Sequence, residues 1–212
     1  MVDPGTQPLG RLLPPQAGDL LQRALSDAGV RFHWGTSVQA VHAQPEGLQL
    51  ALANGLRLDT DVVLSAVGLR PRTALAQAAG LQTARGIVVN RQLQTSQPHI
   101  YALGDVAEVE GHNLPYVMPL MQAARTLAAH LAGRPASLRY PAMPVVVKTP
   151  ALPIVVSPPA SGAAGQWQIE ACTDGVDARF VAYDGTVLGF ALAGQATTNK
   201  ADLQKNLPAL LA

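Results

Sequence analysis

The chain has 212 residues, of which 48% are hydrophobic and 14% charged, and its formal net charge is +1. This length suits one large domain or two small ones, with enough apolar residues to bury a core. The near-neutral charge, without a basic run, argues against nucleic acid as a partner. The apolar runs are too short for a membrane span, and no signal-peptide pattern is present. With Cys172 as the single cysteine, we expect a cytoplasmic protein without disulfides or a metal site.

The first third of the chain predicts a helix followed by a series of strands. Residues 18–29 have the apolar periodicity of a helix with one buried face. Asn54-Gly55 is a strong signal for a two-residue hairpin turn, and the near-continuous apolar run 61–67 predicts a buried return strand that ends at Gly68. The expected strands are residues 30–34, 37–43, 48–53, 56–58 and 61–67.

The rest of the chain alternates helices and strands before it becomes rich in strands. Its middle part predicts helices at residues 74–79 and 118–131, strands at 87–90 and 100–103, a loop at 107–115 and a linker at 134–140. The last part predicts strands at residues 145–148, 154–156, 167–172, 178–183 and 187–193, and a closing helix at 199–211. The expected fold class is α/β, α+β overall, with partial Rossmann-like sheets and a small β-rich C-terminal domain.

The segment 95–105 carries the most informative motif, a polar lead-in to an apolar run that ends in Gly-Asp. Gly104 has no Cβ, so another backbone or a ligand can come close. Asp105 follows at the carboxyl end of the predicted strand, where open α/β sheets bind their ligands. A carboxylate there can accept hydrogen bonds from a polyol, although a Gly-Asp pair in this position fits a plain turn equally well.

A second motif, residues 62–71, predicts a buried strand that ends in Gly68 and continues into a proline turn. Alone it fits any strand followed by a turn. Together with the Gly104-Asp105 motif, it resembles the pyridine-nucleotide-dependent flavoprotein reductases, in which the chain here leaves the NAD domain and re-enters the FAD domain. The resemblance implies that Gly104 and Asp105 bind the ribitol of FAD.

Residues 7–14, 65–72, 114–121 and 147–150 resemble the rubredoxin reductases among these flavoproteins. The likeness runs over nearly the whole chain and includes its C-terminal part, where flavoprotein reductases differ most from one another. It implies an oxidoreductase that passes electrons from NADH through FAD to rubredoxin; a small ferredoxin or a similar small iron electron carrier is the alternative acceptor. The implied organisation is a partial NAD-binding domain (1–68), the second half of an FAD-binding domain (69–134) and a rubredoxin-reductase-type domain (135–212).

The same resemblance gives roles to three further residues. Val117 lies where the helix at 118–131 would direct its positive end to the flavin pyrimidine. Lys148 is the only charge in residues 144–156, so it calls for a partner, and the resemblance implies that this partner is the flavin. The alternative is an edge-strand lysine that guards against aggregation. Asp3 would hold the adenosine ribose and favour NADH over NADPH; the alternative is a helix cap or turn aspartate. No catalytic residue is assigned.

The sequence also departs from these reductases. Both G-x-G-x-x-G loops, which supply backbone N–H groups to the pyrophosphates of FAD and NAD, are missing from it. We therefore expect a truncated form that neither binds FAD stably nor oxidises NADH by itself. The alternative is a non-catalytic remnant or an interaction module. Strands without their neighbours should make the chain dimerise or aggregate.

Overall fold

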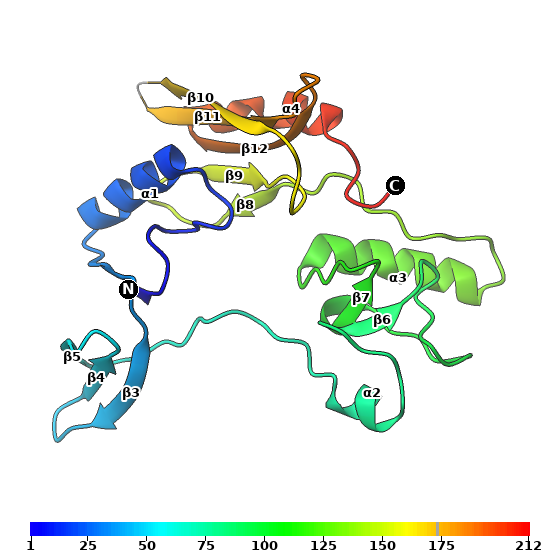
Figure 1. The fold of residues 1–212 in the computed structure, drawn as a ribbon, viewed down its shortest axis with the longest axis horizontal. Coiled ribbons are helices and arrows are strands. Elements are labelled where there is room, and N and C mark those ends of the chain that lie inside the picture. Colours follow the sequence, from blue (N-terminus) through cyan, green and yellow to red (C-terminus); the bar gives the residue numbers. More distant parts are fainter. Residues whose placement is uncertain (173) are drawn as a thin grey trace. The chain divides into compact units, whose positions relative to one another are not determined.

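The computed structural model describes residues 1–172 and 174–212. The chain divides into two compact units, each of which is described by itself. The first unit combines Met1–Ser65 with Pro144–Pro208, and the second combines Ala66–Met143 with Ala209–Ala212 (Figure 1). The domain limits at residues 68 and 134, which come from the family resemblance, stay a prediction.

The first unit begins with a short parallel strand pair and a helix. Strand β1 (Val2–Asp3) pairs in parallel with β2 (His33–Trp34), and α1 (Pro15–Asp27) connects them. Pro15 occupies the first turn, where a helix does not need the missing N–H. Gly29, at φ 92°, follows the helix end in the left-handed region. The predicted helix is confirmed with an earlier start, whereas only the end of the strand at 30–34 forms.

A three-stranded antiparallel meander follows, as predicted. It consists of β3 (Val38–Ala43), β4 (Leu48–Leu52) and β5 (Arg57–Thr60), in the order β3-β4-β5. Gly55 has φ 86° and donates its N–H to the Leu52 carbonyl. The hairpin predicted at Asn54-Gly55 therefore forms, but its loop extends over residues 53–56.

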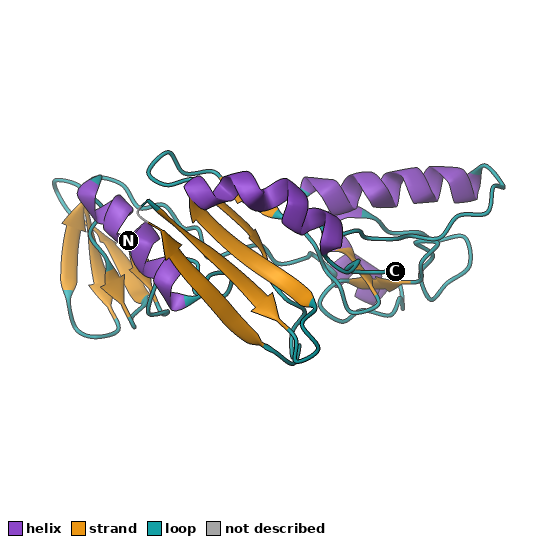
Figure 2. Ribbon diagram, turned by 90° about the horizontal axis from the view of Figure 1, so that it is seen from above, coloured by secondary structure: helices purple, strands orange, loops and turns teal. Residues whose placement is uncertain are grey.

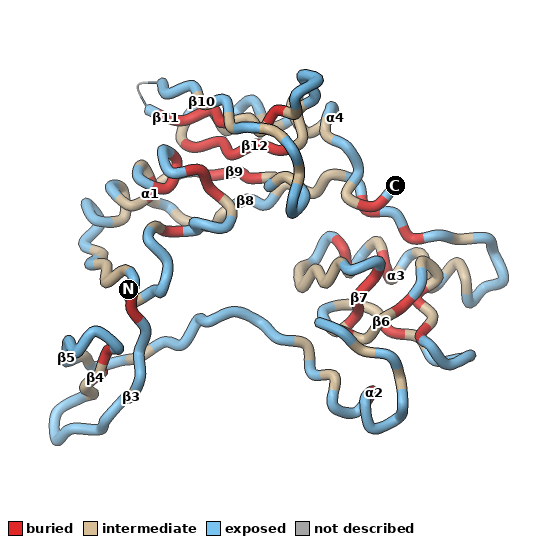
Figure 3. Tube along the Cα trace, viewed as in Figure 1, coloured by how far each residue is buried: buried red, intermediate tan, exposed pale blue. Residues whose placement is uncertain are grey.

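The return strand predicted for residues 61–67 is wrong. This segment has no strand conformation, and the tube in Figure 3 is almost entirely exposed along it. Val62, Leu64 and Val67 are 77%, 87% and 94% exposed. A parallel strand is stable only when it pairs on the sheet and is covered on its faces. Within the described residues no strand pairs with this segment, so its apolar composition alone does not produce one.

The C-terminal part of the first unit is a five-stranded antiparallel sheet, whose orange arrows are prominent in Figure 2. Its order is β10-β11-β12-β9-β8, which makes β8 and β10 the edge strands. All five predicted strands are confirmed with small shifts at their ends. Their bounds are β8 (Val145–Val147), β9 (Ile154–Ser157), β10 (Gln166–Cys172), β11 (Gly175–Val181) and β12 (Val187–Gly194).

Each face of this sheet packs against helical structure. On one face, Leu13, Ala17 and Leu21 at the start of the chain share a buried core with β9, β11 and β12. The other face carries η2 (Gln195–Asn199) and α4 (Lys200–Asn206), which pack around Phe190. The closing helix is shorter than the predicted 199–211, because Pro208 forces the preceding residue Leu207 into an extended conformation (φ −73°, ψ 142°).

A charged network ties this second face together. The Asp177 carboxylate accepts two hydrogen bonds from Arg179, at 2.9 and 2.8 Å, and a third from Asn199 at 3.0 Å. Asp177 is buried, and the Arg179 hydrogen bonds lower the pKa of its carboxyl below the ordinary value, with a smaller contribution from Asn199. The network thus joins β11 to the helical segment after β12.

We expect Asp177→Asn to destabilise the first unit by about 1 kcal/mol at pH 7, because Arg179 is partly solvated and its ion pair is screened. A carboxyl group with a depressed folded pKa stabilises the fold above its unfolded pKa, and this stabilisation is lost as the pH falls through the folded value. The difference between wild type and variant should therefore shrink below about pH 4. Urea unfolding between pH 3 and 7 measures it; a difference independent of pH contradicts the assignment.

The second unit is built around a two-stranded parallel sheet and one long helix. Strand β6 (Ile87–Val89) pairs with β7 (Ala107–Val109). The helices and the single turn of 3-10 helix are α2 (Ala74–Ala78), η1 (Gly104–Val106) and α3 (Val117–Leu131). Both predicted helices are confirmed, and so is the strand at 87–90.

The strand predicted at residues 100–103 is wrong. It is reduced to an isolated bridge between Gln94 and Tyr101, and Ile100 is 42% exposed. The strand of this motif forms instead at β7, within the segment predicted to be a loop. The two positions differ because β7 pairs with β6 along its whole length. The 100–103 run forms only an isolated bridge, flanked by one backbone hydrogen bond from Thr95 to Ile100 and one from Ala102 to Leu93.

The end of the chain completes the core of the second unit. Leu211 and Tyr140 exchange backbone hydrogen bonds, at 2.9 and 3.0 Å, and both are buried together with Leu138. Burial raises the pKa of the Tyr140 phenol above its ordinary value, with a smaller contribution from Tyr116. Residues 209–212 therefore return to this unit after the C-terminal sheet is finished.

Candidate functional site

The second unit contains a pocket at the Gly104-Asp105 turn. Its lining residues come from the segment after Gly68, from the Gly104-Asp105 turn and from the segment just before helix α3. They are Leu69, Arg70, Pro71, Arg72, Asp105, Val106 and Pro115. The two sequence motifs therefore meet at one place in the fold. Three of the lining residues are charged, namely Asp105, Arg70 and Arg72, and the others are apolar.

The turn that carries Asp105 requires glycine at its first position. Gly104 has φ 81°, in the left-handed region that favours glycine. A Cβ on Gly104 would also come within 3.2 Å of Leu120 Cδ1 in α3. The chain then makes the single 3-10 turn η1, in which the Ala107 N–H donates to the Gly104 carbonyl. This conformation places Asp105 on the surface immediately before β7.

The Asp105 carboxylate is exposed, and within residues 1–172 and 174–212 it forms no ion pair or side-chain hydrogen bond. Its backbone carbonyl, by contrast, accepts a hydrogen bond from the Asn113 side chain at 2.8 Å. The backbone is thus held while the side chain stays free to accept hydrogen bonds. That combination suits an acceptor of hydroxyl groups on a bound molecule.

Helix α3 begins next to the pocket wall formed by Pro115. Its first residue, Val117, is 69% exposed, and no side chain caps the helix start at Tyr116. Burial raises the pKa of the Tyr116 phenol. The uncapped N–H groups leave partial positive charge at this end of the helix, which favours a negatively charged or electron-rich group.

Gly68, predicted as part of the site, has φ 96° and directly precedes the lining residue Leu69. Gly68, Gly104, Asp105 and Val117 thus all belong to the second unit. Arg70 and Arg72 lie in the stretch 65–72, but the sequence alone gives them no role in the site. The two arginines on either side of Pro71 are a visible pattern, but only the fold shows that they line the pocket.

Asp3 and Lys148 belong to the first unit. Asp3 ends β1, and its Oδ1 accepts the Gly5 N–H at 2.6 Å, which is the bond of a turn aspartate. The Thr36 N–H donates to the Asp3 carbonyl at 3.4 Å, and the buried Thr36 hydroxyl has no partner among the described residues. The ribose-binding role of Asp3 stays a prediction.

Lys148 is exposed and follows the edge strand β8 directly. No carboxylate of the described residues forms an ion pair with it. Both alternatives therefore stay open for this residue: a contact to the flavin, or a charge that blunts a sheet edge.

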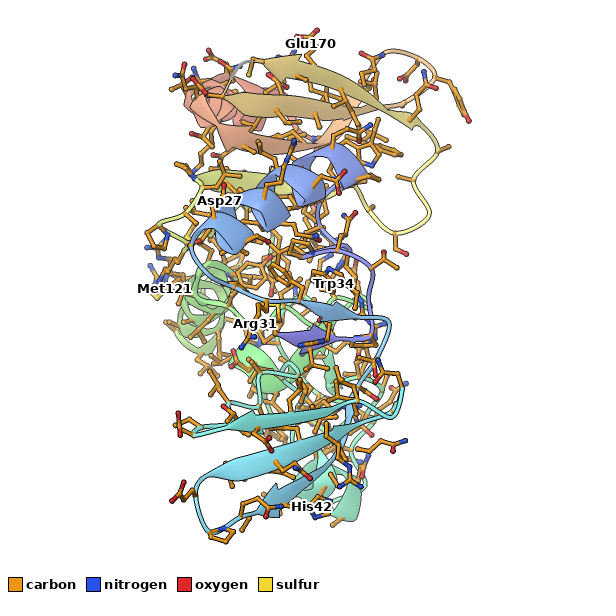
Figure 4. All side chains as sticks on the ribbon, turned by 90° about the vertical axis from the view of Figure 1, so that its left-hand side faces the viewer. Asp27, Arg31, Trp34, His42, Met121 and Glu170 are labelled. Atoms are coloured by element: carbon orange, nitrogen blue, oxygen red, sulfur yellow. The ribbon has the colours of Figure 1, made fainter. Side chains whose placement is uncertain are left out.

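Aromatic side chains cluster near β2 in the same unit. Phe32 and Trp34 stack with ring centroids 4.9 Å apart. The Trp34 indole, labelled in Figure 4, donates a hydrogen bond to Gln22 of α1 at 3.0 Å. This contact links the helix to the strand that pairs with β1 and so helps to fix the position of Asp3.

The described residues lack two kinds of feature. They include no helix long and apolar enough to cross a membrane. They also include no group of three or more histidine, cysteine, aspartate or glutamate side chains that could hold a metal ion.

Comparison with known proteins decides the family. A sequence model of the pyridine nucleotide-disulphide oxidoreductases matches residues 1–128. The chain belongs to this family. A second model, the rubredoxin binding C-terminal domain, matches residues 137–207, which include the whole five-stranded sheet. The resemblance drawn from the sequence is therefore confirmed at the level of the family.

Curated relatives extend the same likeness. Rubredoxin-NAD(+) reductase of Alcanivorax borkumensis is 51% identical over 97% of this chain and 55% of that protein. The enzyme of the same name from Acinetobacter baylyi is 44% identical over 100% of the chain and 54% of that protein. Nitric oxide reductase FlRd-NAD(+) reductase of Aeromonas salmonicida is 39% identical, with similar coverage of 98% and 54%. The chain spans about half the length of the curated relatives it matches.

Solved structures share the fold. A ferredoxin reductase from Rhodopseudomonas palustris superimposes with a TM-score of 0.83 at 26% identity, over 99% of this chain and 54% of that one. An NADH:rubredoxin oxidoreductase from Clostridium acetobutylicum gives 0.73 at 19% identity, over 97% and 51%. The second match supports the fold alone.

Proposed function

We propose that these residues form the flavin-ribitol and rubredoxin-binding part of an NADH-dependent rubredoxin reductase. The proposal depends on one observation: the oxidoreductase match and the rubredoxin-binding match follow each other along one chain. The exposed Asp105 lines a pocket within the first of these matches. The relatives are named rubredoxin-NAD(+) reductases, so we take NADH as the electron donor and rubredoxin as the electron acceptor.

The second unit fits the polyol part of FAD. Gly104 allows the turn to pack close to Leu120 of α3, because it has no Cβ. The Asp105 carboxylate has acceptor oxygens for ribitol hydroxyls. The exposed start of α3, at Val117, would favour the negative charge that a reduced flavin carries on its pyrimidine. When bound, FAD would accept a hydride from NADH and release its electrons singly to the iron of rubredoxin. The residues present do not include a glycine loop for the pyrophosphate.

The first unit contains the other residues to which we assign a contact with NADH, the flavin or rubredoxin. The carboxylate of Asp3 would accept hydrogen bonds from the adenosine ribose of NADH. The exposed ammonium group of Lys148 would approach the flavin. The sheet β8–β12 would receive rubredoxin, because all five of its strands lie within the matched rubredoxin-binding domain.

A second candidate function is a non-catalytic interaction module. It is favoured by the two parallel sheets, which have only two strands each within the described residues. Parallel sheets normally have more strands and helices on both faces. Such a module would bind rubredoxin without transferring electrons to it.

A chimera separates the two candidates. The part of the Alcanivorax borkumensis relative that has no counterpart in this chain is fused before Met1, and rubredoxin reduction by NADH is followed by absorbance. We expect a yellow protein that reduces rubredoxin, whereas the 212-residue chain alone retains no flavin and oxidises no NADH. A chimera that holds FAD and oxidises NADH without reducing rubredoxin would overturn the proposal.

In this chimera, Asp105→Ala is expected to raise the dissociation constant for FAD about 10- to 100-fold, because a hydrogen bond to a charged group contributes about 1.5–3 kcal/mol. The unfolding midpoint should hardly change, since the carboxylate has no partner in the described structure. Asp202→Ala is the matched control, an exposed aspartate of α4 whose carboxylate pairs with Lys205. Flavin fluorescence titration measures both variants; unchanged affinity in Asp105→Ala refutes the ribitol assignment.

A further inference from the structure

The chain reverses direction directly after β7. Val109 and His112 exchange two backbone hydrogen bonds, at 3.0 and 2.9 Å. Glu110 and Gly111 between them have φ 46° and 79°. Two consecutive left-handed residues are the mark of a type I′ hairpin turn, which sends the chain back along the strand it came from. Asn113 thereby returns to the level of the Asp105 turn.

Asn113 then closes on that turn. Its Nδ2 donates hydrogen bonds to the Asp105 carbonyl at 2.8 Å and to the Ala107 carbonyl at 2.9 Å. The side-chain amide of asparagine has two N–H donors, and both meet acceptors here. The two carbonyls lie on either side of Val106, so one side chain fixes the backbone before and after the residue that lines the pocket beside Asp105.

Gly86 holds the turn from a second direction. It is buried, and its N–H donates to Glu108 Oε2 at 2.9 Å. A Cβ at this position would lie 2.5 Å from the Val106 carbonyl oxygen and 3.3 Å from Asn113 Nδ2. Only glycine therefore leaves room for the turn and its asparagine to pack against the start of β6.

The tip of the hairpin is anchored as well. Arg91 donates to both carboxylate oxygens of Glu110, at 2.6 and 3.0 Å. This hydrogen bonding lowers the pKa of the Glu110 carboxyl, and it raises the pKa of Arg91. The ion pair connects the loop after β6 to the I′ turn, and so keeps the returning segment that carries Asn113 in register.

We propose that Asn113 is a positioning residue for the pocket. It holds the backbone of the Asp105 turn in its ligand-binding shape before any ligand arrives, so that the carboxylate meets a polyol without a cost of ordering the turn. The proposal rests on the proposed function only for the identity of the polyol as flavin ribitol. Asn113 itself touches no ligand; it acts through the backbone on Asp105.

Amide hydrogen exchange of the 212-residue chain tests the clamp without a ligand. The probe is the Ala107 N–H, which donates to Gly104 within the turn. Asn113→Ala should accelerate its exchange about tenfold, since two hydrogen bonds are lost. Asn90→Ala is the matched control, because Asn90 also makes two side-chain hydrogen bonds to backbone, to the N–H groups of Gln92 and Gln94. Unchanged exchange in Asn113→Ala overturns the proposal.

Asn113→Asp distinguishes a donor from a space-filling residue. The new carboxylate has the same shape but turns acceptor oxygens toward two carbonyls, so its effect should equal or exceed that of Asn113→Ala. A residue that only fills space would tolerate aspartate, and that result contradicts the proposal.

The chimera supplies the second readout. Both Asn113 variants should raise the FAD dissociation constant about tenfold, while Asn90→Ala leaves it unchanged. Equal FAD affinity in all variants overturns the positioning role even if exchange accelerates. If instead wild-type chimera binds no FAD, the proposed function fails, and the exchange data alone decide whether Asn113 holds the turn.

Discussion

Phe190→Ala is expected to lower the free energy of unfolding of the first unit by about 3–5 kcal/mol. Phe190 is fully buried between the C-terminal sheet and the helical segment that includes Leu203 and Leu207. Its removal leaves a cavity that the antiparallel strands on either side of β12 cannot close. All five strands of the sheet lie within the matched rubredoxin-binding domain, so the rubredoxin binding that we propose for this chain should be lost along with the fold.

Denaturant unfolding followed by tryptophan fluorescence measures this effect, since Trp167 lies in the same sheet and packs edge-on against Phe180 at 5.5 Å. Tyr183→Ala is the control: this aromatic residue is 86% exposed, and its loss should change stability by less than about 0.5 kcal/mol. If Phe190→Ala costs no more than Tyr183→Ala, the core assigned to this face of the sheet is incorrect.

The second large effect concerns association. The chain is expected to self-associate, because the segment 62–69 exposes four large apolar side chains, with Leu69 73% exposed. Unpaired apolar segments of this kind add to other chains as strands. Combining Val62→Thr, Leu64→Lys and Val67→Thr should shift the protein to the monomer at micromolar concentration.

Size-exclusion chromatography with light scattering gives the mass directly. Leu75→Lys is the matched control, since Leu75 is 85% exposed on the short helix α2 and outside this segment. It should leave the association unchanged. A wild-type chain that elutes as a compact monomer is the contrary result.

Elements with local signals could be predicted from the sequence. Helices α1 and α3 have apolar faces and well-placed prolines, and the meander and the last five strands have turn residues between apolar runs. The strand at 61–67 could not be predicted correctly, because a parallel strand depends on neighbours that composition does not reveal. The prediction of the closing helix past Pro208 is also wrong, although a proline is a local signal that restricts the preceding residue, Leu207, to an extended conformation and so ends a helix.

The same distinction applies to the site. Gly104 and Asp105 were predicted because a glycine before an acid at the end of an apolar run is visible in the sequence. Asn113 was not, because its contact depends on the I′ turn at Glu110 and Gly111, and Glu110 is not a residue that commonly adopts positive φ. The pocket lining by Arg70 and Arg72 likewise requires the fold.

One core of the first unit contains residues from both family matches. Helix α1 lies in the part matched by the oxidoreductase family, yet Ala17 and Leu21 share a core with Ile154 and Ala191 of the rubredoxin-binding part. The two matched regions are therefore not independent in the first unit. The β1 end with Asp3 and the C-terminal sheet should unfold together.

Rubredoxin binding by the 212-residue chain is the most direct test of the central claim, because it needs neither flavin nor NADH. The oxidised iron protein is titrated into the chain by isothermal calorimetry, with a small ferredoxin as the competing acceptor. We predict saturable one-to-one binding of rubredoxin and none of ferredoxin. Binding of ferredoxin alone, or of neither protein, would contradict the account.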